Sequence, residues 1–479
     1  MINFSRFFVL ERATPDKKAI LITVDCLRAD HLSCYGYARR TSPLIDTLAV
    51  KGIRFENAFA NGPNTPPCFR SILTSGYPFE FPRPEPFAPN VELLSEVLKR
   101  KGVRTAAIHS NPYLSAFYGF DRGWSYFKDF LSRDYVSRYS KTKRSFGYLV
   151  RKHLPEVIRE WWDSAATFSG LSRNPTENAK TITEDAMSWL RENKDFPFFL
   201  WIHYMDLHEP YFLVDTKVKR KFSRKLSRLS QARLNCIWRR ALQGNPQNQP
   251  GESIKDIINV YDDKVSYVDE NLSKFFEFLS HEGLADCAFI ILCADHGQEL
   301  LDHESVGHGG DNFFDEILHI PLILFGLGLQ SQVDRKLVSQ LDITPTILDF
   351  YGIKTSKDYR GSSLLSTRTN SLVIAEGFPK RGPTYAIRTK KWKYIWTRKK
   401  KRQLYNLEED NEEMENLIEL ERTKVEEFQA IIERHMIWEA KLRTERRTAS
   451  EKEKTLSRMK KLKTKLHTLH GRSCHKVDI

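Results

Sequence analysis

Two long apolar runs, far apart in the sequence, both end in residues that commonly bind metals. One covers residues 19–24 and is followed by Asp25, and the other covers residues 288–294 and is followed by Asp295 and His296. Runs this apolar predict strands buried on both faces, as in a parallel sheet covered by helices. Since the site of an open α/β sheet lies at the carboxyl ends of its strands, these side chains are predicted to converge on one cation. The simpler reading of each residue is a turn or helix-capping residue.

A third segment, residues 61–76, strengthens the first reading. A Gly/Pro-rich loop presents Thr65, and an apolar pattern with helical spacing follows it. A hydroxyl at such a junction is predicted to face backbone N–H groups and the positive end of a helix dipole. That environment suits an anionic substrate, so the three segments together favour metal-assisted ester chemistry.

The stretch from Val24 to Gly36 resembles the N-terminal metal motif of the sulfatase family, within the alkaline phosphatase superfamily. Further stretches resemble this family in the same order: the Thr65 loop, His203–Tyr211, Ala294–Gly297, Gly307–Gly310, Tyr385–Tyr394 and Leu404–Asp410. The similarity extends over residues 17–415. It implies an α/β, alkaline-phosphatase-like sandwich with a mainly parallel central sheet, a smaller antiparallel C-terminal subdomain and a helical basic tail.

The resemblance also implies a metal-binding set made of Asp25, Asp295, His296 and the oxygen of Thr65. Many sulfatases have two adjacent Asp at the first strand end, where this chain has Val24 before Asp25. Many also have Asp-Asn where this chain has Asp295-His296. Carboxylate and imidazole together suit Mn²⁺, Zn²⁺ or Fe better than Ca²⁺. We therefore expect a divalent cation, with Mn²⁺, Zn²⁺ and Ca²⁺ all left open.

The predicted nucleophile is Thr65. The family's usual motif is Cys-x-Pro-x-Arg, whose Cys is oxidised to formylglycine, but Cys68 has no Pro two residues later, so no formylglycine is expected. The pattern Thr65-x-Pro67 fits instead. A threonine hydroxyl needs a cation or a base to activate it. A sulfated threonine lacks the hemiacetal hydroxyl through which formylglycine eliminates sulfate, and this favours phospho-esters over sulfate esters.

Two histidines are catalytic candidates by the resemblance. His208 and His308 match positions that contact the oxygens of the transferred group or protonate the leaving group, and an imidazole can do either near neutral pH. His203 follows the apolar run 198–202, and a structural role and a site role remain equally open for it.

Three further residues are candidates for substrate binding. His109 and Asn111 follow a short apolar strand predicted at residues 103–108, where relatives place polar groups that bind oxygen. Arg70 lies one residue out of register with the family's arginine, so its predicted role in anion binding rests on the residue type.

Composition and pattern agree with a large enzyme. The 479 residues are 41% hydrophobic, enough for a sizeable core and more than one domain. Predicted strands alternate with helical patterns, which is typical of an α/β sandwich. We predict a catalytic domain at 17–370 with insertions at about 130–175 and 217–251, a C-terminal subdomain at 371–415, and a helical basic tail at 416–479.

The net charge of +14 is concentrated in two places. Residues 217–251 hold ten Lys/Arg and no Asp/Glu, and residues 441–479 hold thirteen Lys/Arg against four Asp/Glu. Such segments either dock on anionic lipid or polyanionic glycan or are simply solvated. No nucleic-acid-binding module is recognisable, so a specific nucleic-acid partner is not expected. The expected partner is an anionic ester: a sulfated or phosphorylated glycan, lipid or small molecule.

The N-terminus and the cysteines predict the compartment. The first twelve residues contain only a short apolar patch, with a charge at position 6, unlike a signal peptide, and no run of 18 apolar residues occurs. The seven cysteines show no disulfide pattern. These features predict a cytoplasmic protein, with the basic tail leaving attachment to the inner membrane surface open.

The sequence thus predicts a metal-dependent hydrolase of the sulfatase family. It would cleave sulfate or phosphate mono- or diesters by attack of Thr65, with phospho-esters favoured. Two alternatives remain: a transferase that moves a phospho-group to lipid or glycan, and a non-catalytic protein that binds polyanions or a membrane surface.

Overall fold

A computed structural model describes most of the chain. The described residues are 16–81, 87, 91–131, 176–209, 218–225, 251–303, 305–309, 312–378, 382–398 and 401–473, together with a few residues between 227 and 241. Nearly all of the insertion predicted at about 130–175, and much of that at 217–251, lies outside the described residues.

An eight-stranded sheet forms the centre of the molecule, in the order β10-β2-β9-β6-β1-β5-β3-β4. Its strands are β1 (Lys18–Val24), β2 (Ile53–Phe59), β3 (Arg104–Ile108), β4 (Tyr126–Lys128), β5 (Phe198–Tyr204), β6 (Ala288–Ala294), β9 (Leu322–Phe325) and β10 (Gln332–Ser339). Neighbouring strands are parallel, except that β9 is antiparallel to β2 and β6. The expected α/β fold with a mainly parallel sheet is therefore confirmed.

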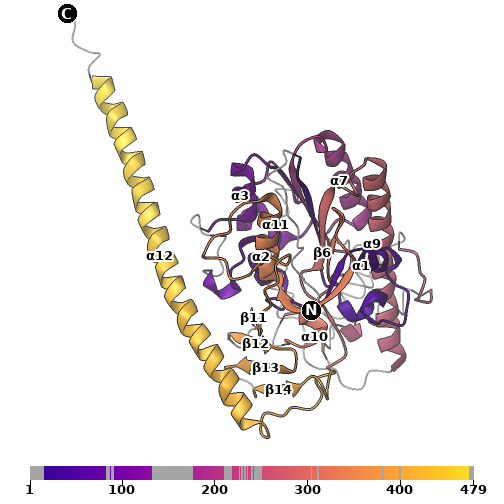
Figure 1. The fold of residues 1–479 in the computed structure, drawn as a ribbon. Coiled ribbons are helices and arrows are strands. Elements are labelled where there is room, and N and C mark those ends of the chain that lie inside the picture. The colour runs from indigo at the N-terminus through magenta and orange to yellow at the C-terminus, as the bar shows by residue number, and fades with distance from the viewer. Residues whose placement is uncertain are drawn as a thin grey trace, which may run out of the picture.

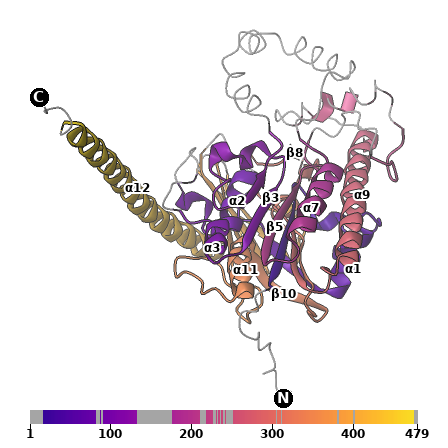
Figure 2. The ribbon, with the colours of Figure 1, turned by 90° about the horizontal axis from the view of Figure 1, so that it is seen from above.

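Two layers of helices cover this sheet (Figures 1 and 2). One layer contains α1 (Pro43–Lys51), α7 (Ala179–Asn193) and α9 (Gly251–His281); the other contains α2 (Thr65–Thr74), α3 (Leu94–Arg100) and α11 (Ile343–Tyr351). Helices α1 and α7 both pack against α9, while α2, α3 and α11 pack against one another. Strands β5 and β6 are buried along their whole length, as two covered faces require. A short helix, α10 (Asp315–Leu318), and a two-stranded sheet, β7 (Glu299–Leu300) and β8 (Val306–Gly307), lie in the connections.

A second, antiparallel sheet follows in the chain, as the sequence predicts. It consists of β11 (Val373–Gly377), β12 (Thr384–Arg388), β13 (Trp392–Thr397) and β14 (Gln403–Asn406). Helix α12 (Arg422–Ser473) packs across it and then continues beyond the rest of the molecule (Figure 1). Phe428 and Ile432 of α12 are buried there among aromatic and aliphatic side chains of the sheet. The first part of α12 is therefore docked on the small sheet by its apolar side chains.

Polar side chains are also buried under α12. Glu439 accepts a hydrogen bond from the Tyr385 hydroxyl (3.0 Å), and His435 contacts a carboxylate oxygen of Glu376. Glu376 and Glu439 are completely inaccessible to solvent. Helix and small sheet are therefore joined by apolar packing and by a buried polar cluster.

Candidate active site

Three neighbouring strands end at the same level of the central sheet. Val24, the last residue of β1, pairs with Tyr204 of β5 and with Ala294 of β6. The residues that follow, Asp25 and Asp295, therefore lie side by side at the carboxyl edge. The peptide N–H of Asp25 still bonds to the Tyr204 carbonyl (2.9 Å), which extends the ladder by one residue.

The chain leaves the sheet directly after Asp25. Cys26 has a φ of +59°, in the left-handed region that side chains rarely adopt, and its N–H donates to Oδ1 of Asp295 (3.3 Å). Backbone strain of this kind is concentrated at functional sites. The turn holds the two carboxylates against each other.

Asp25, Asp295 and His296 form a compact, fully buried group. One ligand atom from each lies within 4.8 Å of the others. Nε2 of His296 is 3.9 Å from Oδ1 of Asp25 and 3.5 Å from Oδ2 of Asp295. Nδ1 of His296 contacts the Gly297 carbonyl (2.8 Å), which can only accept a hydrogen bond, so the proton of the neutral ring lies on Nδ1. The lone pair of Nε2 then faces the carboxylates, as in a metal ligand.

This group fits a divalent cation. Oδ2 of Asp295 is buried and has no hydrogen-bond partner among the described residues. Burial and the charge of Asp25 raise the pKa of Asp295 well above its usual value. Burial also acts to raise the pKa of Asp25, but the hydrogen bond with His203 and the charges of His208 and His296 hold that pKa well below its usual value. Two adjacent buried carboxylates are costly unless a cation or a shared proton compensates them.

Thr65 lies directly beside this group. It is the first residue of α2, its hydroxyl donates to Oδ2 of Asp25 (3.2 Å), and the same oxygen is 3.3 Å from Nε2 of His296. The expectation that backbone N–H groups surround it is wrong in part, because Pro66 and Pro67 have no N–H and the N–H of Cys68 is bonded to Asn64. An anion here would interact with the helix dipole more than with N–H donors.

His208 and His308 lie next to each other, and His308 also lies against His296. Their ring centroids are 4.9 Å apart, and that of His308 is 4.5 Å from that of His296. Burial opposes the charged form of His208, but Asp25 and Glu209 outweigh it, so the pKa of His208 is raised. Burial and the neighbouring His296 lower the pKa of His308 to about 3.

Two residues that the sequence analysis did not select complete this part of the site. Nδ1 of His308 bonds to Oε1 of Gln298 (2.7 Å), and Nε2 of Gln298 donates to Glu209 (2.7 Å). Glu209 lies within the matched stretch His203–Tyr211, and Gln298 directly follows the matched stretch Ala294–Gly297. Their positions in the sequence were a usable signal, although nothing in the residue types indicated that they bond to each other.

His203 and Asn111 both contact Asp25. Nε2 of His203 is 3.5 Å from Oδ2 of Asp25, and the amide of Asn111 donates to the same oxygen (3.2 Å). Of the two readings left open for His203, the geometry favours a place in the site. Asn111 supports a carboxylate directly, whereas the resemblance implied a contact with substrate.

His109 and Arg70 do not join this group in the same way. His109 is completely buried, stacks on Trp201 at a centroid distance of 5.2 Å, and has no hydrogen bond to either ring nitrogen among the described residues. The Arg70 guanidinium lies near the rings of Phe81 and Phe87, at 5.8 and 5.9 Å. It lines a separate pocket, because one residue along α2 rotates a side chain by about 100°.

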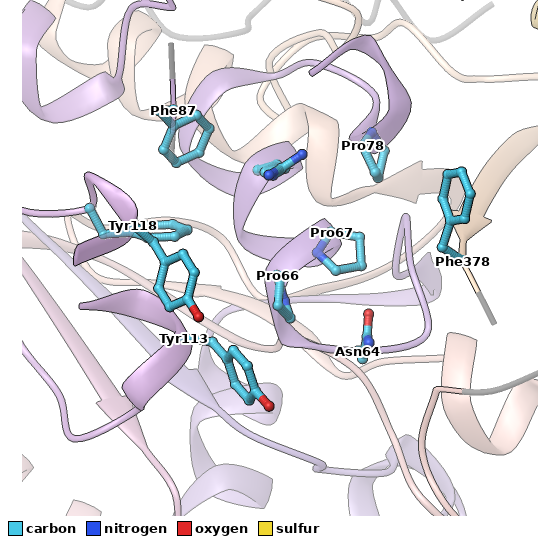
Figure 3. A pocket seen from close by; sticks show the side chains of 10 residues that line it. Asn64, Pro66, Pro67, Pro78, Phe87, Tyr113, Tyr118 and Phe378 are labelled. Atoms are coloured by element: carbon cyan, nitrogen blue, oxygen red, sulfur yellow. The ribbon is translucent and has the colours of Figure 1, made fainter. Parts of the chain in front are cut away.

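That pocket is a cavity of about 270 Å³ beside Thr65 (Figure 3). Its lining residues are Asn64, Pro66, Pro67, Arg70, Pro78, Phe87, Tyr113, Tyr118, Phe120 and Phe378. Rings therefore form most of the described wall, and Arg70 is the one ionised side chain among the described residues that line it.

Comparison with known proteins decides the family. The family model described as Sulfatase matches residues 17–353. The chain belongs to the sulfatase family. It is 23% identical over 435 residues to a choline-sulfatase of Rhizobium meliloti (strain 1021). The aligned region covers 81% of this chain and 79% of the choline-sulfatase. This member of the sulfatase family is thus a hydrolase of sulfuric or phosphoric ester bonds, and such enzymes generally use a divalent metal.

Solved structures agree on the fold of this sulfatase-family chain. A phosphonate monoester hydrolase of Agrobacterium radiobacter gives a TM-score of 0.65 at 19% identity, with 90% of this chain and 96% of that one covered. A protein solved in complex with its substrate, D-glucosamine-2-N,6-O-disulfate, gives a TM-score of 0.63 at 17% identity. This match covers 89% of this chain and 98% of that protein's chain. Separately, no helix in the described part of the chain is both long and apolar enough to cross a membrane.

Proposed function

We propose that this protein is a metal-dependent phospho-ester hydrolase with Thr65 as its nucleophile. The observation that carries the proposal is the position of the Thr65 hydroxyl, 3.2 Å from Asp25 and 3.3 Å from His296. The alternative nucleophile is poorly placed: the Cys68 thiol donates to the Gly62 carbonyl (3.1 Å), and burial raises its pKa well above the usual value.

A divalent cation held by Asp25, Asp295 and His296 would supply Lewis-acid activation of the threonine hydroxyl and would neutralise charge on the transferred group. Oδ2 of Asp25 already accepts the hydroxyl hydrogen bond, so the proton of Thr65 has an acceptor at hand. Thr65 Oγ1 forms a bond to phosphorus while the bond to the leaving oxygen breaks. Water then attacks the phospho-threonine and restores the hydroxyl.

His208, whose pKa is raised, is proposed to protonate the leaving oxygen, and His308, whose pKa is lowered to about 3, is proposed to face the same side of the substrate as a neutral ring. Nδ1 of His208 contacts the Glu209 carbonyl (2.6 Å) and Nδ1 of His308 contacts Gln298, so in both rings Nε2 is the atom left for substrate. Asn111 and His203 are proposed to position Asp25. Arg70 and His109 are proposed to act outside this reacting centre: Arg70 in the neighbouring pocket, and His109 by packing behind the sheet edge.

The test compares three p-nitrophenyl esters (sulfate, phosphate and phenylphosphonate) after loading the protein with Mn²⁺ or Zn²⁺. We expect the two phospho-esters to be cleaved much faster than the sulfate. Thr65→Ala should lower kcat at least ~10³-fold, because removing a nucleophile removes the covalent route. Thr65→Ser should retain part of the activity.

Cys68→Ala is the matched control, and it should remain active with all substrates that the wild type cleaves. Loss of activity in Cys68→Ala together with an oxidised Cys68 in the intact mass would refute the nucleophile assignment. Dominant release of sulfate would refute the phospho-ester preference while leaving the family unaffected.

A further inference from the structure

A second buried group of metal-binding side chains lies between α12 and the small sheet (Figure 1). This interface group consists of Glu376, His435 and Glu439, and one ligand atom from each lies within 4.8 Å of the others. Glu376 belongs to β11, whereas the other two lie four residues apart, on one face of α12. Both glutamates are completely buried, and the histidine side chain is 8% exposed. The interface group shares no residue with the group proposed to hold the catalytic cation.

In each carboxylate of the interface group, one oxygen is anchored and the other lies near the imidazole. Oε2 of Glu376 accepts a hydrogen bond from the N–H of Phe79 (2.7 Å), and Oε2 of Glu439 accepts one from the Tyr385 hydroxyl (3.0 Å). Nε2 of His435 is 2.5 Å from Oε1 of Glu376 and 3.6 Å from Oε1 of Glu439. This Oε1 of Glu439 is buried and has no hydrogen-bond partner among the described residues. Carboxylates that bind a metal are commonly oriented by hydrogen bonds of this kind.

The spacing of the three donor atoms is close to that of ligands around one Zn²⁺ ion. Bonds of about 2.0–2.1 Å at tetrahedral angles place two donor atoms about 3.3 Å apart. The two separations from the imidazole nitrogen, 2.5 and 3.6 Å, lie on either side of that value, so small side-chain shifts suffice. Carboxylate oxygens and an imidazole nitrogen are ordinary zinc ligands, and a fourth position remains for water or a second carboxylate oxygen.

The charge of the interface group also favours a cation. A neighbouring buried carboxylate, Glu80, is paired with two arginines, Arg360 (2.8 Å) and Arg446 (2.9 Å). The two carboxylates of the interface group have no such partner: within the described part of the chain, their ion pairs are both with the one imidazole. The charge of Arg443 acts on Glu376 without an ion pair, and more weakly than burial does. Two adjacent buried carboxylates are costly unless they are compensated, and a divalent ion would supply the missing charge.

We propose that the interface group binds a Zn²⁺ ion that fastens α12 to the small sheet. The inference goes beyond the proposed function, because this ion is additional to the catalytic one and takes no part in turnover. When the ion is absent, a proton takes its place between the two carboxylates. Burial and the charge of Glu376 raise the pKa of Glu439 in that state. The effect of pH on α12 through Glu439 therefore belongs to the metal-free protein.

The first test counts zinc in the tag-free, full-length protein by elemental analysis, after equilibration with Zn²⁺ and removal of the excess. His435→Gln should bind one ion fewer per chain than the wild type. Glutamine can still donate a hydrogen bond to Glu376, but it lacks the imidazole nitrogen that binds zinc. The same loss is expected when His435→Gln is added to Asp295→Ala, in which the catalytic group lacks one ligand.

Glu433→Gln is the matched control, since Glu433 is an exposed carboxylate of the same helix. It should leave the zinc count unchanged. An equal count in the wild type and in His435→Gln would overturn the inference, as would an Asp295→Ala protein whose zinc content does not depend on His435.

Hydrogen exchange tests whether the ion fastens the helix. Zn²⁺ added to metal-free Asp295→Ala should slow exchange in peptides covering residues 422–438. If the ion binds only the docked helix, the slowing is about 100-fold at a free Zn²⁺ concentration 100 times the Kd. Asp295→Ala combined with His435→Gln should show no slowing, and equal slowing in the two proteins would overturn the inference. Neither test depends on turnover, so failure of the hydrolase proposal and failure of this inference are distinguishable.

Discussion

Replacement of Glu439 by Gln should change how strongly α12 holds the small sheet as the pH rises. The Glu439 side chain is completely buried, and its Oε1 has no hydrogen-bond partner among the described residues. Burial, together with the adjacent charge of Glu376, raises its pKa to about 10. Tyr385 and His435 face it from β12 and from its own helix.

The direction of the effect follows from comparing the folded and unfolded states. An unfolded glutamate ionises near pH 4.5, whereas the folded one keeps its proton up to about pH 10. The contribution of Glu439 to stability is therefore complete below the unfolded pKa and is lost as the pH rises through the folded pKa. Between these two pKa values the folded state binds one more proton than the unfolded state, which changes the free energy of unfolding by about 1.4 kcal/mol per pH unit. Raising the pH from 6 to 8 therefore lowers that free energy by about 3 kcal/mol.

The assay is hydrogen exchange of peptides covering residues 422–438 in the wild type and in Glu439→Gln, converted to a free energy of opening. We expect the wild type to lose about 3 kcal/mol more than the variant between pH 6 and pH 8. Glu426→Gln, on the exposed face of the same helix, should behave like the wild type. Parallel pH dependence in wild type and Glu439→Gln would show that Glu439 is already ionised in the folded protein, and the reasoning would be refuted.

Further predictions concern packing, site geometry and metal. Ile432→Ala should reduce the opening free energy of α12 by about 2–5 kcal/mol in the same exchange assay, because it leaves a cavity in the small-sheet core; Ile437→Ala, at a side chain that is 72% exposed, should have little effect. Gly297→Ala should weaken cation binding in calorimetry, since an added Cβ would lie 1.9 Å from the Glu316 carbonyl oxygen and would displace His296; unchanged affinity would contradict this. A chelator should abolish turnover, and Mn²⁺ or Zn²⁺ should restore it; activity that survives complete metal removal would exclude a metal-dependent reaction.

The central part of the site was predictable because its positions follow from strand ends. Asp25 and Asp295 come directly after fully apolar runs, so their meeting at one edge follows from parallel packing alone. Thr65 was predictable from a loop-to-helix junction. The bond between Gln298 and His308 was not, because it depends on the path of an irregular loop.

Arg70 shows a second limit of sequence reasoning. Residue type alone suggested an anion-binding arginine, but a shift of one position along a helix turns a side chain by more than a quarter of a circle. Phe69 instead faces the interior, where its ring is 5.0 Å from those of Trp201 and His203. Similarly, the short apolar strand before His109 predicted the location of that residue correctly but not its burial against Trp201. Register and burial need the packed structure.

The shared register of β1, β5 and β6 has a consequence for how this enzyme can change. The spacing between Asp25 and Asp295 is set by hydrogen-bonded backbone in the middle of the sheet. The aromatic pocket, in contrast, is built largely from loop segments such as residues 112–120, which are anchored near the reacting centre through Asn111. Loops tolerate substitution and exchange far better than interior strands do. The proposed metal-binding group and the lining of this pocket can therefore evolve, or be engineered, almost independently of each other.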